Sequence, residues 1–338
     1  MILIKSFSNI LKPYVIAIPT FSREKIIFRR TLKTLYECNI KSDFIYLFFA
    51  SDDEYKKYLD SFSNVEVYKN KIDNRKYKVW LNKIKCVIGI LGLSNQRNYI
   101  SKFFQEGQYI VQMDDDIQDF SFLKYNTSEP KNRKQWNLQS FKKKKTLIGG
   151  SKYESIRKTT KLQKQINKSK KKLNTNVNTY MEKLKNPKTL HNLINDTFKY
   201  CDMNGIYLWG IYPIENAYFM NPEPSTKLKF IVGPCFGIIN RHNKALELTI
   251  DEKENVERTL QYWTMDGAVL RLNNICLRTQ YYRVPGGMQS EGKDRKAEAL
   301  KSAELLHSKY PKITKIYLGK KSGHPEIKLV NNGIKKSI

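Results

Sequence analysis

The chain has 338 residues, of which 40% are hydrophobic, and its 61 Lys and Arg against 32 Asp and Glu give a formal net charge of +29. These apolar residues suffice for a core, which excludes a wholly disordered chain. No apolar run is long enough to cross a membrane, which excludes a helical membrane protein. The start lacks a signal-peptide pattern and the five cysteines form no CxxC pair, so we expect a reduced protein of the cytoplasm or nucleus without a structural zinc.

Up to residue 125, short apolar runs alternate with stretches in which apolar side chains recur every three or four residues. The first pattern predicts strands and the second predicts helices. The predicted strands are 12–21, 43–53, 64–68 and 109–113, and the predicted helices are 23–37, 51–62 and 94–104. This alternation is typical of a mostly parallel sheet covered by helices on both faces, so we predict an α/β fold.

Polar side chains follow three of these strands at the points where the strands end. Thr20 comes after the first strand, Asp52 and Asp53 after the second, and Asp114-Asp115-Asp116 after the last. Ligands of parallel sheets bind at the carboxyl ends of the strands. We therefore expect these groups to share one site.

The three consecutive aspartates admit two interpretations. Adjacent carboxylates at a strand end suit Mg²⁺ or Mn²⁺, which prefer hard oxygen ligands and leave room for substrate phosphates. The alternative is a solvated acidic turn, because most acidic triplets are turns of this kind. The apolar strand before the triplet and the strongly cationic chain favour the metal site, since such a chain has little need of an acidic turn for solubility.

A strongly basic stretch interrupts the alternating pattern. Residues 131–172 carry sixteen Lys or Arg and one acid, Glu154, which is about half of the net charge. We predict a solvated, partly disordered insertion over 126–185, and the same stretch is compatible with an arm that contacts the phosphates of DNA. The densest cluster of this arm is formed by Lys142, Lys143, Lys144 and Lys145.

Beyond the insertion the pattern is less regular. We predict helices over 186–203, 254–263 and 264–274, strands within 229–241, and an aromatic-rich loop over 204–222. Thr264 or Asp266 is the expected N-cap of the last of these helices. The predicted organisation is one domain in two halves, 12–125 and 186–300, with the insertion 126–185 between them and a basic tail over 301–338.

Several motifs resemble GT-A glycosyltransferases. IAIPTFSREKIIFRRTLKTL is similar to the first strand and nucleotide-binding loop of that fold, and FFASDDEY to its second strand end. GLSNQRNYI is similar to the Gly-x-x-x-x-Arg-Asn segment, and YIVQMDDDI falls where the fold has its Asp-x-Asp motif. LWGIYPIENAYFM, FIVGPCFGIINR and ENVERTLQYWTMDGAVLRLN narrow the resemblance to the TET-associated glycosyltransferases, over roughly residues 14–125 and 186–290.

Members of that family occur in phages, viruses and eukaryotes and are proposed to attach a sugar to hydroxymethylated pyrimidines in DNA. The resemblance therefore implies a GT-A fold, a nucleotide-sugar donor with a UDP-sugar as the expected form, and a Mn²⁺ or Mg²⁺ cofactor. It implies modified DNA, such as DNA with 5-hydroxymethylcytosine, as the acceptor, and a viral or phage origin is consistent with it. No sequence feature points to a protein partner.

The resemblance also assigns donor and metal residues. Asp114 would contact the ribose side and the metal, Asp116 would bind the metal, and Asp115 would lie between them. His324 would complete the metal coordination, unless it is an ordinary surface histidine. The further residues implied for the nucleotide, its base and its diphosphate are Pro19, Thr20, Arg23, Asp52, Asp53 and Arg97.

The motif expected for the catalytic base departs from the family pattern. Inverting members of this fold place Glu-Asp at the start of a late helix that leads into Leu-Arg-Leu. In TMDGAVLRL the aspartate is Asp266, but Met265 stands where the glutamate is expected. The alternative register places Glu254 and Asn255 there, and an amide cannot act as a base. Asp266 is thus the first candidate and Glu254 the second, unless Asp266 is only a helix cap or the reaction retains configuration.

Aromatic residues of the loop after the insertion are candidates for acceptor binding. Trp209, Tyr212 and Tyr218 are placed by the resemblance to stack on a flipped base, and the alternative is ordinary packing. Three functions remain open from the sequence: a glycosyltransferase of modified DNA, the same fold acting on a glycan, lipid or protein, and a catalytically silent nucleic-acid-binding relative.

Overall fold

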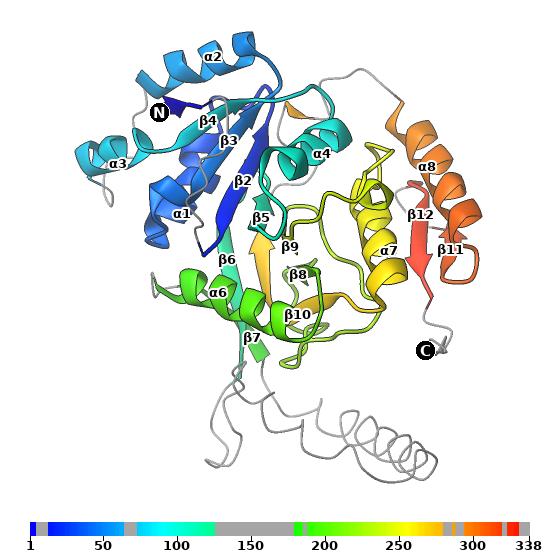
Figure 1. Cartoon of the computed structure of the whole chain (residues 1–338). Helices are drawn as coiled ribbons and strands as arrows, with labels where there is room; N and C mark the ends of the chain where they lie inside the picture. Colours follow the sequence, from blue (N-terminus) through cyan, green and yellow to red (C-terminus); the bar gives the residue numbers. More distant parts are fainter. Residues whose placement is uncertain are drawn as a thin grey trace.

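In the part of the chain that the computed structural model describes, ten strands form one sheet with helices on both faces (Figure 1). The described residues are 1–4, 13–63, 73–125, 179–184, 188–279, 286–287, 294–319 and 323–330. The strand order is β1-β4-β3-β2-β5-β9-β8-β10-β6-β7, and five of the nine pairings are parallel. The predicted α/β class with a mostly parallel sheet is confirmed.

One half of the sheet is entirely parallel. Its strands are β1 (Ile2–Leu3), β4 (Lys85–Ile88), β3 (Ile45–Phe49), β2 (Val15–Thr20) and β5 (Tyr109–Met113). Because these strands run in one direction, the segments that follow β2, β3, β4 and β5 all emerge at the same edge.

The other half is mixed. Its strands are β9 (Cys235–Ile239), β8 (Leu208–Tyr212), β10 (Leu270–Arg278), β6 (Asp119–Tyr125) and β7 (Thr179–Lys183). β9 is antiparallel to β5 and β8, and β10 is parallel to β8. The carboxyl ends of β8 and β10 therefore lie at the same edge as that of β5.

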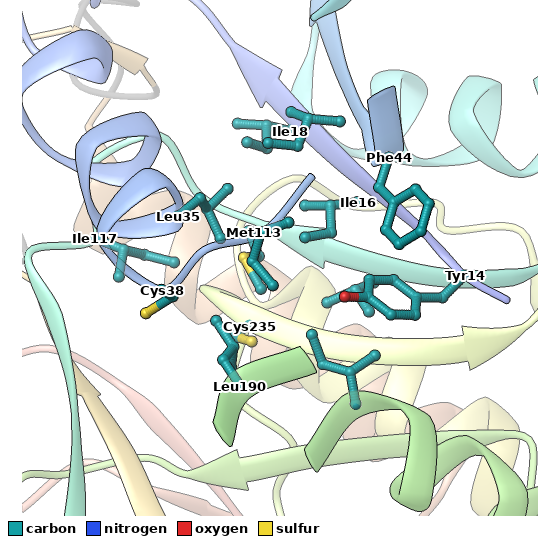
Figure 2. Close-up of a cluster of buried hydrophobic side chains, with 14 of the residues drawn as sticks. Tyr14, Ile16, Ile18, Leu35, Cys38, Phe44, Met113, Ile117, Leu190 and Cys235 are labelled. Carbon is teal, nitrogen blue, oxygen red and sulfur yellow. The ribbon is translucent and has the colours of Figure 1, made fainter. Parts of the chain in front are cut away.

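Two hydrophobic cores fill the space between the sheet and its helices. In the first core Ile16 of β2 and Met113 of β5 lie near Leu35 and Leu190 of the covering helices (Figure 2). The helices of this core are α1 (Thr31–Glu37), α2 (Asp52–Ser63), α3 (Asn74–Leu81) and α6 (Lys188–Met203), and those of the second are α4 (Leu93–Phe103) and α7 (Glu254–Asp266).

The alternation of side chains along β2 explains how one strand supplies both cores. Ile16 and Ile18 belong to the first core, and Val15 and Ala17 belong to the second, with none of these side chains exposed. Successive side chains of a strand point to opposite faces, so a continuous apolar run is required where both faces are covered. Each buried side chain of the size of Ile stabilises the fold by about 1.5–3 kcal/mol.

The C-terminal region forms an ordered unit against α7. It consists of α8 (Arg295–Lys309), β11 (Thr314–Tyr317) and β12 (Glu326–Leu329), the last two paired as an antiparallel hairpin. A third core joins Leu306 of α8 to Leu260 of α7. Much of the segment expected to be a basic tail is thus a helix and a hairpin that lie beside α7 in Figure 1.

The structure differs from the sequence-based elements in several places: α3 and β4 were not predicted, and β8 lies within the predicted loop over 204–222. The helix predicted over 264–274 is wrong, since α7 extends to Asp266 and residues 270–278 form β10. The strand predicted over 64–68 and the central part of the insertion, 126–178, lie outside the described residues. None of the described helices is both long enough and apolar enough to span a membrane.

Candidate active site

A cavity of about 830 Å³ lies at the edge of the sheet where the parallel strands end. Its walls come from the carboxyl ends of β2 and β5, the first turns of α4 and α7, and β12. This volume is typical of sites for small molecules and cofactors. The structure brings together seven of the residues predicted to bind donor or metal: Pro19, Thr20, Arg23, Arg97, Asp114, Asp115 and Asp116. We name residues 114–116 the aspartate loop.

Arg23 connects the segment after β2 to the aspartate loop. Its Nη1 donates to Asp115 Oδ1 at 2.9 Å and to Asp116 Oδ2 at 2.8 Å. Thr20 donates to the second oxygen of Asp115 at 2.7 Å, and Thr279 donates to Oδ1 of Asp116 at 3.0 Å. Both carboxylates are thus held on both oxygens by protein side chains.

Two residues of α2 support the segment after β2. The hydroxyl of Tyr58 lies 2.6 Å from Thr20 Oγ1 and accepts a hydrogen bond from the N–H of Arg23 at 3.0 Å. Glu54 accepts a hydrogen bond from the N–H of Ser22 at 2.8 Å. Tyr58 and Glu54 are buried, and burial raises the pKa of the Tyr58 phenol. These contacts fix the backbone that carries Thr20 and Arg23.

Arg97 extends from α4 to the start of the aspartate loop, with a side chain only 2% exposed. Its Nη2 donates to Asp114 Oδ1 at 3.0 Å and its Nη1 donates to Gln112 Oε1 at 3.0 Å. Its Nε lies 3.5 Å from Glu254 Oε1. The guanidinium therefore fixes the orientation of Asp114, whose side chain is 33% exposed in the cavity wall.

Glu254, the first residue of α7, lies between two guanidinium groups. Its Oε2 accepts a hydrogen bond from Arg258 Nη1 at 2.6 Å, while its Oε1 faces Arg97. A Cβ atom at Gly233 would lie 3.0 Å from Glu254 Oε1, so a larger residue at that position would crowd the carboxylate. Burial lowers the pKa of Arg258 to about 10, although Glu254 opposes this shift. Glu254 is thus a buried, doubly paired anion.

The electrostatics of this cluster are unbalanced. Burial raises the pKa of Asp115 to about 7, and the attraction of Arg23 offsets only part of that effect. Burial also raises the pKa of Asp114 against the opposing influence of Arg97. The aspartate loop and Glu254 supply four carboxyl groups to three guanidinium groups, and Asp115, with its raised pKa, is partly protonated at neutral pH.

The side chains of the aspartate loop fit a divalent cation. In the described ranges no three His, Cys, Asp or Glu side chains are gathered to hold a metal ion, but Mg²⁺ commonly needs only one or two carboxylates together with substrate phosphates. Asp114 offers a second oxygen for which the described residues provide no partner. Asp116 could add a ligand by exchanging its bond from Thr279. Oxygen ligands suit such an ion, and a bound cation would favour the ionised form of Asp115.

Three predicted residues lie away from the cavity wall. The side chains of Asp52 and Asp53 are 60% and 86% exposed and pair with Lys56 on the first turn of α2. His324 is half-buried before β12 and is not among the residues that line the cavity. The structure therefore does not bring these side chains to the aspartate loop.

Asp266, the first candidate for the catalytic base, lies at the wrong end of its helix. It is the last residue of α7, where both of its oxygens accept hydrogen bonds of 2.8 Å from Arg241. The predicted N-cap role is wrong, and Asp266 does not line the cavity. The second candidate, Glu254, starts α7 and lies in the cavity wall.

The predicted acceptor residues separate into buried and exposed ones. Trp209 is 1% exposed and packs against Phe198 in the core, so it is not available to stack on a base. Tyr212 ends β8 and donates a hydrogen bond to the carbonyl of Phe219, and Tyr218 is 75% exposed. Lys142, Lys143, Lys144 and Lys145 lie outside the described residues.

Sequence analysis missed three carboxylates of the cavity wall, Asp251, Glu252 and Glu326. Asp251 Oδ1 accepts hydrogen bonds from the N–H of Ser94 at 2.8 Å and from its hydroxyl at 2.7 Å. These bonds satisfy a free backbone donor in the first turn of α4. No local signal reveals this contact, because 157 positions separate the two residues.

Comparisons with known proteins identify a family. A family model described as TET-Associated Glycosyltransferase matches residues 14–205, which is more than half of the chain. Among solved structures, S. aureus TarS 1-349 is similar with a TM-score of 0.42 and 11% sequence identity, over 78% of this chain and 59% of that one. The chain thus spans less than two thirds of that structure. Comparison with curated proteins gave no significant match.

Proposed function

Because the chain belongs to the TET-associated glycosyltransferase family, we propose that it moves a sugar from a nucleotide-sugar donor to the hydroxyl of a hydroxymethylated pyrimidine in DNA. A bond forms between the anomeric carbon of the sugar and the acceptor oxygen, and the bond from that carbon to the diphosphate breaks. The nucleoside diphosphate leaves, and the proton of the acceptor hydroxyl passes to a base. A UDP-sugar is the proposed donor.

The convergence of Arg97, Arg23 and the aspartate loop on one cavity is the observation that carries this proposal. Asp114 and Asp116 are the residues that would hold Mn²⁺ or Mg²⁺, which supplies a Lewis acid for the departing diphosphate when it is bound. A bound cation would also screen the anionic diphosphate from the carboxylates of the aspartate loop. The cluster is therefore suited to a donor that arrives together with a cation.

We assign two different tasks to the carboxylates near α7. Glu254 is paired with Arg97 and Arg258, so its task is to hold Arg97 in position toward Asp114. Asp251 is anchored by one oxygen, and the described residues give its other oxygen no partner. Asp251 is thus the better candidate to accept the proton of the acceptor hydroxyl.

The net charge of +29 supports a polyanionic acceptor. The test is to incubate the protein with Mn²⁺, a panel of nucleotide sugars and hydroxymethylated or unmodified DNA, and then to digest the DNA and determine the nucleoside masses. A mass increase by one sugar, confined to hydroxymethylated DNA, is the expected result. Transfer only to glycan, lipid or protein acceptors would contradict the DNA assignment. Absence of both donor binding and donor hydrolysis would identify a silent relative.

A separate variant tests the assignment of the metal site. Asp116→Ala is expected to abolish transfer while the circular dichroism spectrum stays unchanged, because the variant loses a metal ligand. Asp196→Ala, at an exposed position of α6, is the matched control and should keep full activity. Binding of Mn²⁺ and of a nucleoside diphosphate, measured by calorimetry, should weaken in the first variant only. Full transfer activity of Asp116→Ala would refute the metal assignment.

A further inference from the structure

Three cationic side chains gather beside the cavity, two on the segment that precedes β9 and one on β10. Lys229 lines the cavity, and Lys227 is exposed two residues earlier. Lys229 lies close enough to Arg271 of β10 and to Lys227 for their charges to interact, and burial together with this repulsion lowers the pKa of Lys229. In the part of the chain that the structure describes, neither Lys227 nor Lys229 forms an ion pair with an acidic side chain. A cluster of like charges without acids is unfavourable unless an anion joins it.

An exposed aromatic pair lies on the neighbouring loop. Tyr218 and Phe219 are 75% and 62% exposed, and their rings meet edge to face with centroids 5.0 Å apart. Ile214 on the same loop is 59% exposed. Large apolar side chains grouped at a surface mark binding sites more often than single exposed ones do.

Direct contacts connect the aromatic pair to the cations. The Tyr212 hydroxyl donates to the carbonyl of Phe219 at 2.9 Å, and the Arg271 guanidinium lies 5.0 Å from the centre of the Tyr212 ring. Ser225, between the loop and Lys227, exchanges two backbone hydrogen bonds with Arg271. The loop that carries Phe219, the segment that carries Ser225 and Lys227, and β10 thus form one continuous surface.

The same loop is also tied to the aspartate loop. Glu215 accepts hydrogen bonds from Arg278 at 2.8 and 3.1 Å, and the next residue, Thr279, donates to Asp116 at 3.0 Å. The contacts of Glu215 with Arg278 and of Thr279 with Asp116 therefore connect the loop that carries the aromatic pair to the proposed donor site. Lys229, on this surface, and Asp116, to which the loop is connected, both line the cavity.

We propose that this surface binds the nucleic-acid acceptor, with Lys227, Lys229 and Arg271 on its phosphates and with Tyr218 and Phe219 stacked on a base. This inference rests on the proposed function, since it concerns the acceptor side of the same site. Basic side chains that neutralise phosphates and aromatic rings that stack on bases are the two elements of single-strand and flipped-base recognition. A polyanion without bases would use only the cations, so the aromatic pair favours nucleic acid.

The cations are tested by the salt dependence of binding. Lys227→Gln/Lys229→Gln should weaken binding of a hydroxymethylated oligonucleotide, measured by fluorescence anisotropy. The slope of log K against log salt concentration should fall by about two, because two phosphates would no longer be neutralised by a lysine. The matched control is Lys76→Gln/Lys78→Gln on α3, which lies at the far end of the sheet and should keep the original slope (Figure 1). Equal slopes for the two double variants would overturn the phosphate site.

The aromatic pair is tested with and without bases in the ligand. Phe219→Ala should weaken binding of a single-stranded oligonucleotide by about 5- to 150-fold, the range measured for loss of one stacked base. It should leave binding of an abasic oligonucleotide of equal length unchanged. Equal loss for both ligands, or no loss for either, would overturn the stacking assignment. Loss confined to the lysine variant would point instead to a base-free polyanion.

Donor hydrolysis separates this inference from the function on which it rests. In the absence of acceptor, Lys227→Gln and Phe219→Ala should bind and hydrolyse the nucleotide sugar like the parent protein, because neither residue lines the cavity. If the parent modifies DNA and the variants do so equally well, the surface assignment is wrong and the proposed function stands. If the variants lose DNA binding but no form of the protein transfers a sugar, the surface stands and the proposed function falls.

Discussion

The hydroxyl of Thr31 links α1 to the aspartate loop by donating a hydrogen bond of 2.8 Å to the carbonyl oxygen of Asp114. The same hydroxyl accepts a hydrogen bond of 2.8 Å from the N–H of Ile117, just beyond the loop. Thr31 is 1% exposed. One buried hydroxyl therefore fixes the backbone on both sides of the three carboxylates.

Thr31→Val should loosen this loop, because Val keeps the shape of the side chain and removes both hydrogen bonds. Leaving the carbonyl and the N–H unsatisfied should lower the free energy of unfolding by about 1–3 kcal/mol. Calorimetry should show weaker binding of Mn²⁺ with nucleoside diphosphate. Thr31→Ser keeps the hydroxyl and should retain most of that affinity. Equal affinities for both variants would show that the loop needs no such support.

Asp251→Asn and Glu254→Gln should affect different steps. Asp251→Asn can still accept the bonds from Ser94, so it should keep donor affinity and lower the rate of transfer by about 10²- to 10⁴-fold. Glu254→Gln should weaken donor binding, because Arg97 loses a charge that holds it. Donor titrations and single-turnover transfer measure the two effects. Transfer at the parental rate by Asp251→Asn would exclude it as the base.

Asp266→Asn should act on stability and leave catalysis intact. The bidentate pair with Arg241 is largely buried, with side-chain exposures of 7% and 17%, so its loss should cost about 1–3 kcal/mol in unfolding free energy. Urea denaturation measures this cost, and the donor hydrolysis rate should equal that of the parent. A hydrolysis rate reduced 100-fold or more in a folded variant would restore Asp266 to the active site.

Glu215→Gln should destabilise the protein in a pH-dependent way. The hydrogen bond from Arg278 lowers the pKa of Glu215 below its ordinary value of 4.5, so the stabilisation is present above that value and is lost as the pH falls through the lowered pKa. At pH 7 the variant should be less stable than the parent by about 0.2–1 kcal/mol. Urea unfolding at pH 7 and at about pH 3 should show this difference shrinking under acid conditions. A difference that grows on acidification would contradict the ion pair.

Leu306→Ala should reveal whether the C-terminal unit supports the site. Leu306 is fully buried against α7, so truncation should cost about 2–5 kcal/mol if the unit unfolds together with the domain. Leu305→Ala, at a neighbouring position that is 37% exposed, is the control and should cost much less. Separate melting of the C-terminal unit, without loss of donor binding, would show that β12 is dispensable for the cavity.

Local pattern was sufficient for β2, β3, β5, α1, α2 and α4, but it predicted neither α3 nor β4. A strand such as β2 needs apolar side chains on both faces, and this requirement appears as a continuous apolar run in the sequence. The polar residues at the strand ends then converge because parallel strands emerge at one edge, which brought Thr20 and the aspartate loop into one predicted site.

Arg97 was predicted from the resemblance of GLSNQRNYI to a family segment, which short-range patterns alone do not supply. They could not place Asp266 or Asp251, because the end of α7 depends on packing and the partner of Asp251 is 157 positions away. Thr31, the hairpin of β11 and β12, and the pairing of Glu254 with two arginines were likewise decided by the assembled fold. Contacts between distant segments leave no periodic signal in the chain, since each depends on the geometry of every element between them.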